Sequence, residues 1–546
     1  MVFSGYFFFK SLLTKLEEGK FNYWSFIFRK IVRLWPLILI AGGISLLVGY
    51  FLMLPDDYEN LAESVIASSV FANNILNCIT TKNYWNVSNI YKPLMHTWYV
   101  GVLMQAYIII PLVYLFVTRI TKEVRKSFLF TTIVLTAISL GLYLVPSFST
   151  AWKFYYLPFR LFEITVGGLL IFIKPLKSNK WKKILLCCSL VIILLMLTSQ
   201  IEILSSSFML LAVVLGSFVF VWCSNEIELS ERTEKFLSCF AILGKSSYSI
   251  YIWHQVIIAF FLYSVFSDRN ALFFVVLLFL TAVFSFLSYN YIEKPLGRLI
   301  GSKKKETSVI LIGIVFALVI CVLSFIVYMN AGVTRDIPEL DIEASNVHRH
   351  MHAEYCDRPY AWTSEFRDDD NTHILVLGNS FGRDWANVLY EYDSSLDITY
   401  LYYREEEILV YQNWIEEADF IFYVEGPGYK GVSELLLSTV PSEKLYVVGN
   451  KSYGESNGII YAKRGSDYYH NLSVKLPDEL IEQNIMEKER YGAHYIDLIS
   501  PVQNADGKVR VFTDDNRYIS QDCTHLTQAG AQYYARILDF SFLSIK

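Results

Sequence analysis

The stretch Val376-Leu377-Gly378-Asn379-Ser380-Phe381 closes an apolar run that begins at His373. A short apolar run that ends in turn-forming residues is typical of a buried β-strand. Four more runs of this kind follow, at 398–402, 420–424, 445–448 and 495–498. Helical stretches lie between and after them, at 383–392, 431–439, 477–490 and 526–540. Strands that alternate with helices predict a three-layer α/β domain with a parallel sheet, of about 200 residues.

A hydroxyl side chain follows the first strand, and an acid and a histidine lie near the C-terminus in Asp522-Cys523-Thr524-His525-Leu526. Ligands of an open parallel sheet gather at the carboxyl ends of its strands, where Ser380 is expected. We predict that Ser380 is a nucleophile, His525 its general base and Asp522 the partner that orients the base. In the competing interpretation Ser380 is only a turn residue, and Asp522 and His525 cap the helix that begins near Thr527.

The chain as a whole is too apolar for a soluble enzyme of this length. Of its 546 residues, 54% are hydrophobic and only 18% are charged, and the mean hydropathy is +0.36. These values indicate a polytopic α-helical membrane domain. We expect about nine spans, at 31–54, 97–118, 128–148, 155–173, 183–199, 205–223, 247–266, 271–291 and 307–329. Segment 61–80 carries Glu, Ser and Asn, which favours a re-entrant or interfacial segment.

Basic residues predict the orientation of the chain. Four Lys/Arg clusters, at 29–33, 119–126, 174–183 and 294–305, fall on one face of the predicted bundle. Such clusters mark the cytoplasmic side, so loop 55–96 and everything after residue 330 are expected outside. We predict a membrane domain over 1–300, a final linking helix and linker over 301–345, and an exported domain over 346–546.

Two family resemblances agree with this division. Residues 373–546 resemble an SGNH hydrolase domain, with Ser380 in its first block and Asp522-x-x-His525 in its last. Residues 4–300 resemble the acyltransferase-3 family of membrane O-acyltransferases. The matching stretches are Ser4-Gly5-Tyr6, 28–36 (FRKIVRLWP), 93–98 (PLMHTW), 157–163 (LPFRLFE), 243–254 (LGKSSYSIYIWH) and 292–295 (IEKP). The combination is similar to fused bacterial O-acetyltransferases that modify lipopolysaccharide O-antigen, other surface glycans or peptidoglycan.

The chain departs from both family patterns. The SGNH first block usually reads Gly-Asp-Ser, and here it is Gly378-Asn379-Ser380. The oxyanion donors are left open between the backbone amides of Ser380 and Gly426 and the side chain of Asn450. The first acyltransferase-3 helix normally carries an Arg and a His that are thought to be catalytic. This chain starts inside what resembles the second helix, so that pair is expected to be absent.

Three polar residues of the membrane domain are further candidates. Arg160 and Glu163 are three residues apart and share a helical face, which fits either a structural ion pair or a polar wall of an acyl-donor channel. His96 stands at the outer end of its predicted span, as an interfacial side chain or as a proton or acyl relay.

Other site types receive less support from the sequence. An exported domain would permit a Cys356–Cys523 disulfide, and free thiols are the alternative. The His residues are scattered, so no metal site is predicted, and no basic aromatic face suggests nucleic acid.

The residues and the resemblances together suggest three functions. The first is transfer of an acyl group, by resemblance from cytoplasmic acetyl-CoA, to a hydroxyl of a surface glycan or lipid-linked oligosaccharide by a protein of the bacterial inner membrane with a periplasmic domain. The second is a membrane-tethered serine esterase or deacetylase. The third is a non-catalytic transporter or sensor with an ectodomain.

Overall fold

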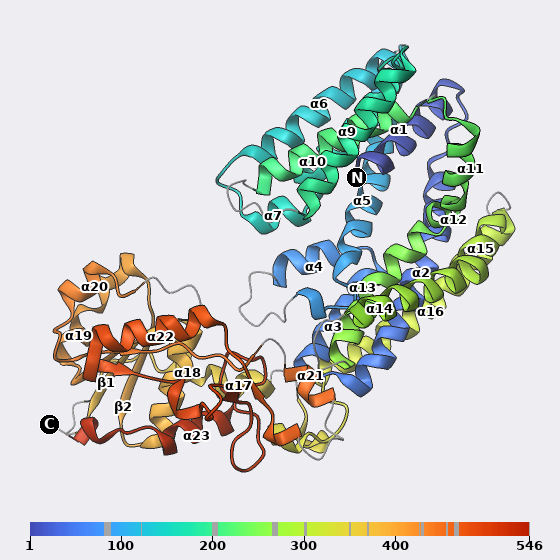
Figure 1. The fold of residues 1–546 in the computed structure, drawn as a ribbon. Helices are drawn as coiled ribbons and strands as arrows, with labels where there is room; N and C mark the ends of the chain where they lie inside the picture. The colour runs from blue at the N-terminus through green and yellow to red at the C-terminus, as the bar shows by residue number, and fades with distance from the viewer. Residues whose placement is uncertain are drawn as a thin grey trace.

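The computed structural model shows a helical membrane body and an α/β head at its end (Figure 1). The structure describes residues 1–80, 89–121, 123–198, 206–225, 227–264, 271–299, 303–348, 351–367, 371–424, 426, 431–454, 457–462 and 469–544. The chain enters the body first and ends in the head, with α16 (Lys303–Met329) leading from one to the other.

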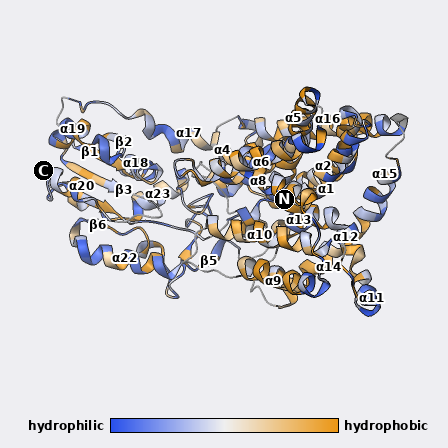
Figure 2. Ribbon diagram, turned by 90° about the horizontal axis from the view of Figure 1, so that it is seen from above, coloured by the Kyte–Doolittle hydropathy of each residue, from blue (hydrophilic) through white to orange (hydrophobic). Residues whose placement is uncertain are grey.

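Seven helical segments of the described chain are long and apolar enough to cross a membrane. They are Tyr23–Leu52, Met95–Ile120, Val124–Leu144, Thr150–Phe172, Ser207–Ser224, Ala271–Leu299 and Lys305–Met329. They contain or coincide with α2 (Tyr23–Leu52), α5 (Trp98–Ile120), α6 (Val124–Leu144), α7 (Thr150–Tyr155), α8 (Leu157–Leu169), α10 (Ser206–Ser224), α14 (Ala271–Ser288), α15 (Lys294–Leu299) and α16. Figure 2 shows hydrophobic residues concentrated in the membrane body and hydrophilic residues along much of α22 (Asp478–Tyr491) in the head.

The two other predicted spans are helical but fall outside these seven. They correspond to α9 (Asn179–Thr198) and α13 (Ser247–Ser264). Three lysines lie in the first turns of α9, and α13 interrupts its apolar residues with Ser, Tyr, His and Gln. The predicted count of about nine spans is therefore only partly matched, and it stays a prediction.

Helix α3 (Pro55–Ser69) turns back along the helix that precedes it. It begins just after α2 ends, with Pro at its first position and two acids in its first turn, as helix starts favour. The indole of Trp35, within α2, donates to the carbonyl of Ser69 at 2.7 Å. Neither α3 nor α4 (Asn73–Thr80) is among the seven candidate spans. The re-entrant or interfacial interpretation of segment 61–80 stays a prediction.

The head is built on a five-stranded parallel sheet with the order β2-β1-β3-β4-β6. The strands are β1 (His373–Gly378), β2 (Asp397–Tyr402), β3 (Phe420–Val424), β4 (Leu445–Val448) and β6 (Tyr495–Ile496). Each strand begins within one residue of the start of a predicted run, and their parallel pairing confirms the predicted parallel sheet. A buried parallel strand is apolar on both faces, and this is why continuous apolar runs revealed it.

Apolar clusters cover both faces of this sheet. On one face Val376 and Phe422 pack with α18 (Ser380–Tyr392) and α23 (Gln528–Ile537). On the other face Leu377 and Tyr423 pack with α19 (Gln412–Glu417) and α20 (Glu434–Thr439). The sheet therefore forms the middle of three layers, with the carboxyl ends of β1, β3 and β4 at one edge.

The head contacts one end of the membrane body through α21 (Asn457–Ala462), which lies beside α3 and α13 in Figure 1. The hydroxyl of Tyr263 in α13 donates to Oδ2 of Asp57 in α3 at 2.6 Å. A Cβ atom at Gly458 of α21 would lie 2.3 Å from Cε1 of Tyr263, so only glycine permits this approach. The guanidinium of Arg335 also bridges the two parts, donating to the hydroxyl of Tyr461 at 3.0 Å and to the carbonyl of Phe51 at 3.3 Å.

Candidate active site

A tight turn at the end of β1 presents Ser380. A Cβ atom on Gly378 would lie 2.3 Å from the carbonyl oxygen of Val424, so the close approach of β1 to β3 requires glycine here. Asn379 caps α18 by accepting from the amide of Phe381 at 2.9 Å. Tyr400 donates to the carbonyls of Gly378 and Asn379, which fixes the turn. Ser380 is thus the first residue of α18, at the sheet edge predicted for it.

The structure brings the three predicted catalytic side chains together. Oγ of Ser380 lies 2.8 Å from Nε2 of His525. Nδ1 of His525 lies 2.6 Å from Oδ2 of Asp522, whose other oxygen accepts from the amides of Thr524 and His525. Burial favours a raised pKa for Asp522, but the charge of His525 and the hydrogen bonds from His525 and Thr524 lower the pKa to about 2.

This arrangement has the connectivity needed for acyl transfer. An imidazole within hydrogen-bond distance of a hydroxyl can take its proton, and a carboxylate on the far ring nitrogen holds the ring in one tautomer. The helix that starts at Ser380 directs backbone amides toward the same place, where a negative oxygen would develop. In the competing interpretation Asp522 and His525 cap the helix near Thr527. The structure instead shows Thr527 as the cap of α23, accepting from the amide of Gly530 at 3.0 Å.

His525 and Asp522 line a cavity of about 530 Å³ that the head shares with the membrane body. The membrane side of the wall is one face of α3, with Asp56, Glu59 and Glu63 at helical spacing. Residues of the head complete the wall. The cavity therefore depends on the contact between the two parts of the chain.

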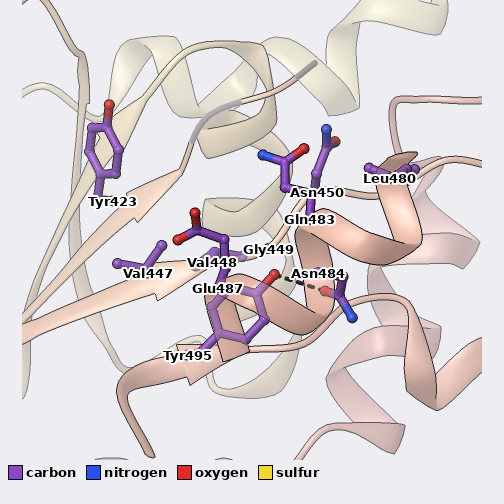
Figure 3. A pocket seen from close by; sticks show the side chains of 10 residues that line it. All are labelled: Tyr423, Val447, Val448, Gly449, Asn450, Leu480, Gln483, Asn484, Glu487 and Tyr495. Atoms are coloured by element: carbon purple, nitrogen blue, oxygen red, sulfur yellow. Dashed lines mark hydrogen bonds between the residues drawn. The ribbon is translucent and has the colours of Figure 1, made fainter. Parts of the chain in front are cut away.

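The oxyanion candidates lie at the same sheet edge. Gly426 follows β3 and is buried, and Asn450 follows β4. The side chain of Asn450 lines a second, smaller pocket beside Gln483 and Glu487 of α22 (Figure 3), and its Oδ1 accepts from the amide of Lys451 at 2.8 Å. Neither residue is among those lining the 530 Å³ cavity. Their oxyanion role stays a prediction.

The predicted disulfide is absent from the described structure, in which Cys356 and Cys523 both carry thiols. The sulfur of Cys356 lies 3.4 Å from the carbonyl oxygen of Leu526, to which it donates. Burial raises the pKa of Cys356 to about 12, and a thiol in this state is a poor partner for disulfide exchange. Of the two alternatives, the structure shows the thiols.

The polar candidates of the membrane body lie in two places. Nη1 of Arg160 and Oε1 of Glu163 are 2.7 Å apart, and both side chains are buried. His96 is buried too, with its ring 5.0 Å from that of Tyr251 and 5.2 Å from that of His254. His254 belongs to α13, so its place beside His96 depends on the approach of α13 to the start of α5.

Sequence reasoning missed a group of charged residues beside Ser380. Asp384 and Lys451 form a buried ion pair of 2.8 Å, and Arg383 approaches Asp384 at 3.3 Å. The one available signal was that Arg383 and Asp384 lie next to each other in a helix that must cover an apolar sheet. Within the described residues no group of three His, Cys, Asp or Glu side chains is arranged to hold a metal ion.

Comparison with known proteins identifies the membrane body. The acyltransferase-3 family model, described as an acyltransferase domain, matches residues 1–290. The O-acetyltransferase OatA of Staphylococcus aureus is 27% identical over 319 residues, which are 54% of this chain and 51% of the relative. An uncharacterized protein of Haemophilus influenzae is 25% identical over 189 residues, which are 33% of this chain and 74% of the relative.

These matches do not extend over whole proteins. The chain spans about half the length of the staphylococcal relative, 51%. No solved structure matches the chain. The match of the family model to more than half of the sequence nevertheless shows that this chain belongs to the acyltransferase-3 family.

Proposed function

We propose that this protein is a membrane O-acetyltransferase that acetylates a hydroxyl of a cell-surface or lipid-linked glycan. Membership of the acyltransferase family and similarity to OatA support the reaction class. The observation that carries the proposal is the 2.8 Å approach of Ser380 to His525, beside a cavity whose wall includes α3 of the membrane body.

The chemistry proceeds in two half-reactions. His525 takes the proton of Ser380 as Oγ attacks the acetyl carbonyl, and the tetrahedral oxyanion faces the amides at the start of α18. The leaving group departs with that proton, which leaves acetyl-Ser380. His525 then takes the proton of a glycan hydroxyl, which attacks the acetyl carbon, and Ser380 regains its proton as the ester of the glycan forms.

The remaining assignments belong to the same proposal. The acetyl donor is cytoplasmic acetyl-CoA, and residues 1–300 pass the acetyl group outward. The membrane body contributes Arg160, Glu163 and His96 to that passage. Residues 301–345 form the last helix and linker, and residues 346–546 act as an SGNH-like domain on the periplasmic side of a bacterial inner membrane, where O-antigen or another surface glycan is the acceptor.

Replacement of Ser380 by Ala tests the proposal in cells that carry the full chain. We expect glycan acetylation to be lost, and acetylation at the wild-type level would remove Ser380 from the mechanism. Surface biotinylation of the variant checks that equal amounts reach the membrane.

The esterase alternative is separated by the fate of the acetyl group. Full-length protein in proteoliposomes is given an acetyl donor and a glycan. Acetylated glycan supports the transferase, whereas acetate with unmodified glycan would favour hydrolysis. If neither acetylated glycan nor free acetate forms, and a fluorophosphonate probe does not label Ser380, a non-catalytic ectodomain is favoured.

A further inference from the structure

A buried carboxylate lies one helical turn from the proposed nucleophile. Asp384 follows Ser380 by four residues in α18, so the two side chains share a face of that helix. The side chain of Asp384 is only 1% exposed. A charge that is this deeply buried is costly unless it is paired and hydrogen-bonded.

One oxygen of Asp384 joins three parts of the head. Its Oδ2 accepts from the backbone amide of Leu526 at 3.0 Å and lies 2.8 Å from Nζ of Lys451. Leu526 directly follows His525, and Lys451 follows the end of β4. The carboxylate thus connects the helix of the nucleophile, the sheet and the loop of the base.

The two peptide units that flank His525 are held by two different carboxylates. The amide of His525 donates to Oδ1 of Asp522 at 2.7 Å, and the amide of Leu526 donates to Oδ2 of Asp384. The backbone of His525 is therefore fixed on both sides, and the ring is left to reach Ser380 through Nε2. A shift of the Leu526 amide would move this ring relative to the hydroxyl.

Lys451 has surroundings that suit a permanent partner of Asp384. Its side chain is 2% exposed, and its Nζ lies 4.0 Å from the ring centroid of Phe381, the residue after Ser380. Burial lowers the pKa of Lys451, and the charge of Asp384 opposes this effect. Its cation balances the carboxylate without occupying the Leu526 amide.

We propose that Asp384 and Lys451 are a positioning pair, which holds the loop of His525 so that its imidazole meets the hydroxyl of Ser380. This inference rests on the proposed function, since it assigns the pair to the same acyl-transfer site. Asp384 positions the base through the Leu526 amide, and Lys451 balances the charge of the acceptor and holds it in place.

Two double variants separate positioning from stability. Asp384→Leu with Lys451→Met replaces the pair by apolar side chains, a change that buried ion pairs often tolerate in stability, but it removes the acceptor for Leu526. The buried Arg383, which also approaches Asp384, keeps the carboxylate of Asp357 as a partner. Asp384→Asn with Lys451→Met also removes both charges and retains a side-chain oxygen for Leu526. The measurement is the rate at which a fluorophosphonate probe labels Ser380 in the full-length protein in detergent, beside its melting temperature.

We expect the Leu/Met variant to melt near the wild-type temperature and to label about 10- to 100-fold more slowly, the loss typical of a displaced catalytic group. The Asn/Met variant should recover most of that rate. Wild-type labelling of a folded Leu/Met variant would overturn the positioning role. Lys488→Met is the control, because it removes another Lys–Asp contact of the head, 3.0 Å long, from α22, and its labelling should not change.

Asp384→Ala with Lys451→Met covers the case in which the Leu/Met variant does not fold. It removes the acceptor for Leu526 with a smaller side chain, and a labelling rate equal to wild type would overturn the proposal. Failure of the proposed function has a different signature. In that case wild-type Ser380 itself is not labelled, whatever stands at 384 and 451.

Discussion

A side chain at Gly458 should separate the head from the membrane body. A Cβ atom there would lie 2.3 Å from Cε1 of Tyr263 and 3.0 Å from Oδ2 of Asp57. Non-bonded carbon atoms prefer a separation of about 3.5 Å or more, so one surface must retreat by about 1.2 Å even for alanine. Gly458→Leu adds three further carbon atoms in the same direction, and the docked arrangement must open.

The size of the effect follows from the contacts at this position. Overpacking costs about 1–3 kcal/mol, and a hydrogen bond from a charged group contributes about 1.5–3 kcal/mol, as for the Arg335 guanidinium, which bridges Tyr461 of the head and the carbonyl of Phe51. The two are comparable, so the strain is relieved by loss of the docking contact. The apolar clusters on the two faces of the head sheet contain neither Gly458 nor Tyr263, so the head itself should stay folded.

Opening moves α3 away from the cavity that contains His525. We therefore expect glycan acetylation to fall about 10- to 100-fold, while probe labelling of Ser380 stays close to wild type. The assay compares acetylated glycan per surface-exposed protein with the labelling rate of the same membranes. Gly244→Leu is the control, because a Cβ atom at Gly244 meets nothing within 4 Å.

Two results would refute this reasoning. Acetylation at the wild-type level in Gly458→Leu would mean that the docked arrangement is not needed for transfer. Equal loss of acetylation and of Ser380 labelling would mean that the strain enters the head instead of the docking contact.

Four further outcomes are expected. Asp522→Asn should lower probe labelling of Ser380 by about 10³- to 10⁴-fold, because the imidazole loses the acceptor that fixes its tautomer. In the wild type, depression of the Asp522 pKa from 3.8 to about 2 stabilises the fold by about 2 kcal/mol above pH 4. This stabilisation should fade between about pH 4 and 2. Acid titration followed by circular dichroism should show the loss in the wild type relative to the Asn variant. Arg160→Leu should reduce the amount of folded protein in membranes more than Arg160→Leu combined with Glu163→Leu, because the single change leaves a buried carboxylate at 163 without this partner; equal amounts would mean that the pair does not matter for folding. Cys356→Ala should leave labelling of Ser380 unchanged, and the wild type should migrate identically on a denaturing gel with and without reductant. A reductant-dependent shift that the variant lacks would indicate a bond to Cys523.

The sequence revealed the sheet because its strands are buried on both faces. The segment 374–377 of β1 and the whole of Phe420–Val424 are apolar at every position, which local patterns detect. Strand β6 proved shorter than its predicted run, since only Tyr495 and Ile496 pair with β4. The spans were harder to count, because α9 and α13 combine apolar residues with lysines or hydroxyls.

The residues of the candidate site were also only partly predictable from the sequence. Ser380, Asp522 and His525 could be named because each belongs to a short local pattern. The role inferred for Lys451 could not, because it depends on two loops that meet only in the folded head. The Tyr263–Asp57 contact joins residues 206 positions apart, and no local signal announces such a pairing. The choice between a Cys356–Cys523 disulfide and free thiols stayed open for the same reason, since spacing along the chain does not show where two sulfurs point.

The face of α3 that carries Asp56, Glu59 and Glu63 has a consequence for protein engineering. Because these residues line the cavity of His525, the wall of the proposed acyl-transfer site is encoded by two distant stretches of the gene. In a chimera that takes only residues 346–546 from a homologue, the foreign head would pack against the α3 of this chain. Exchange of acceptor specificity between homologues therefore calls for moving α3 together with the head.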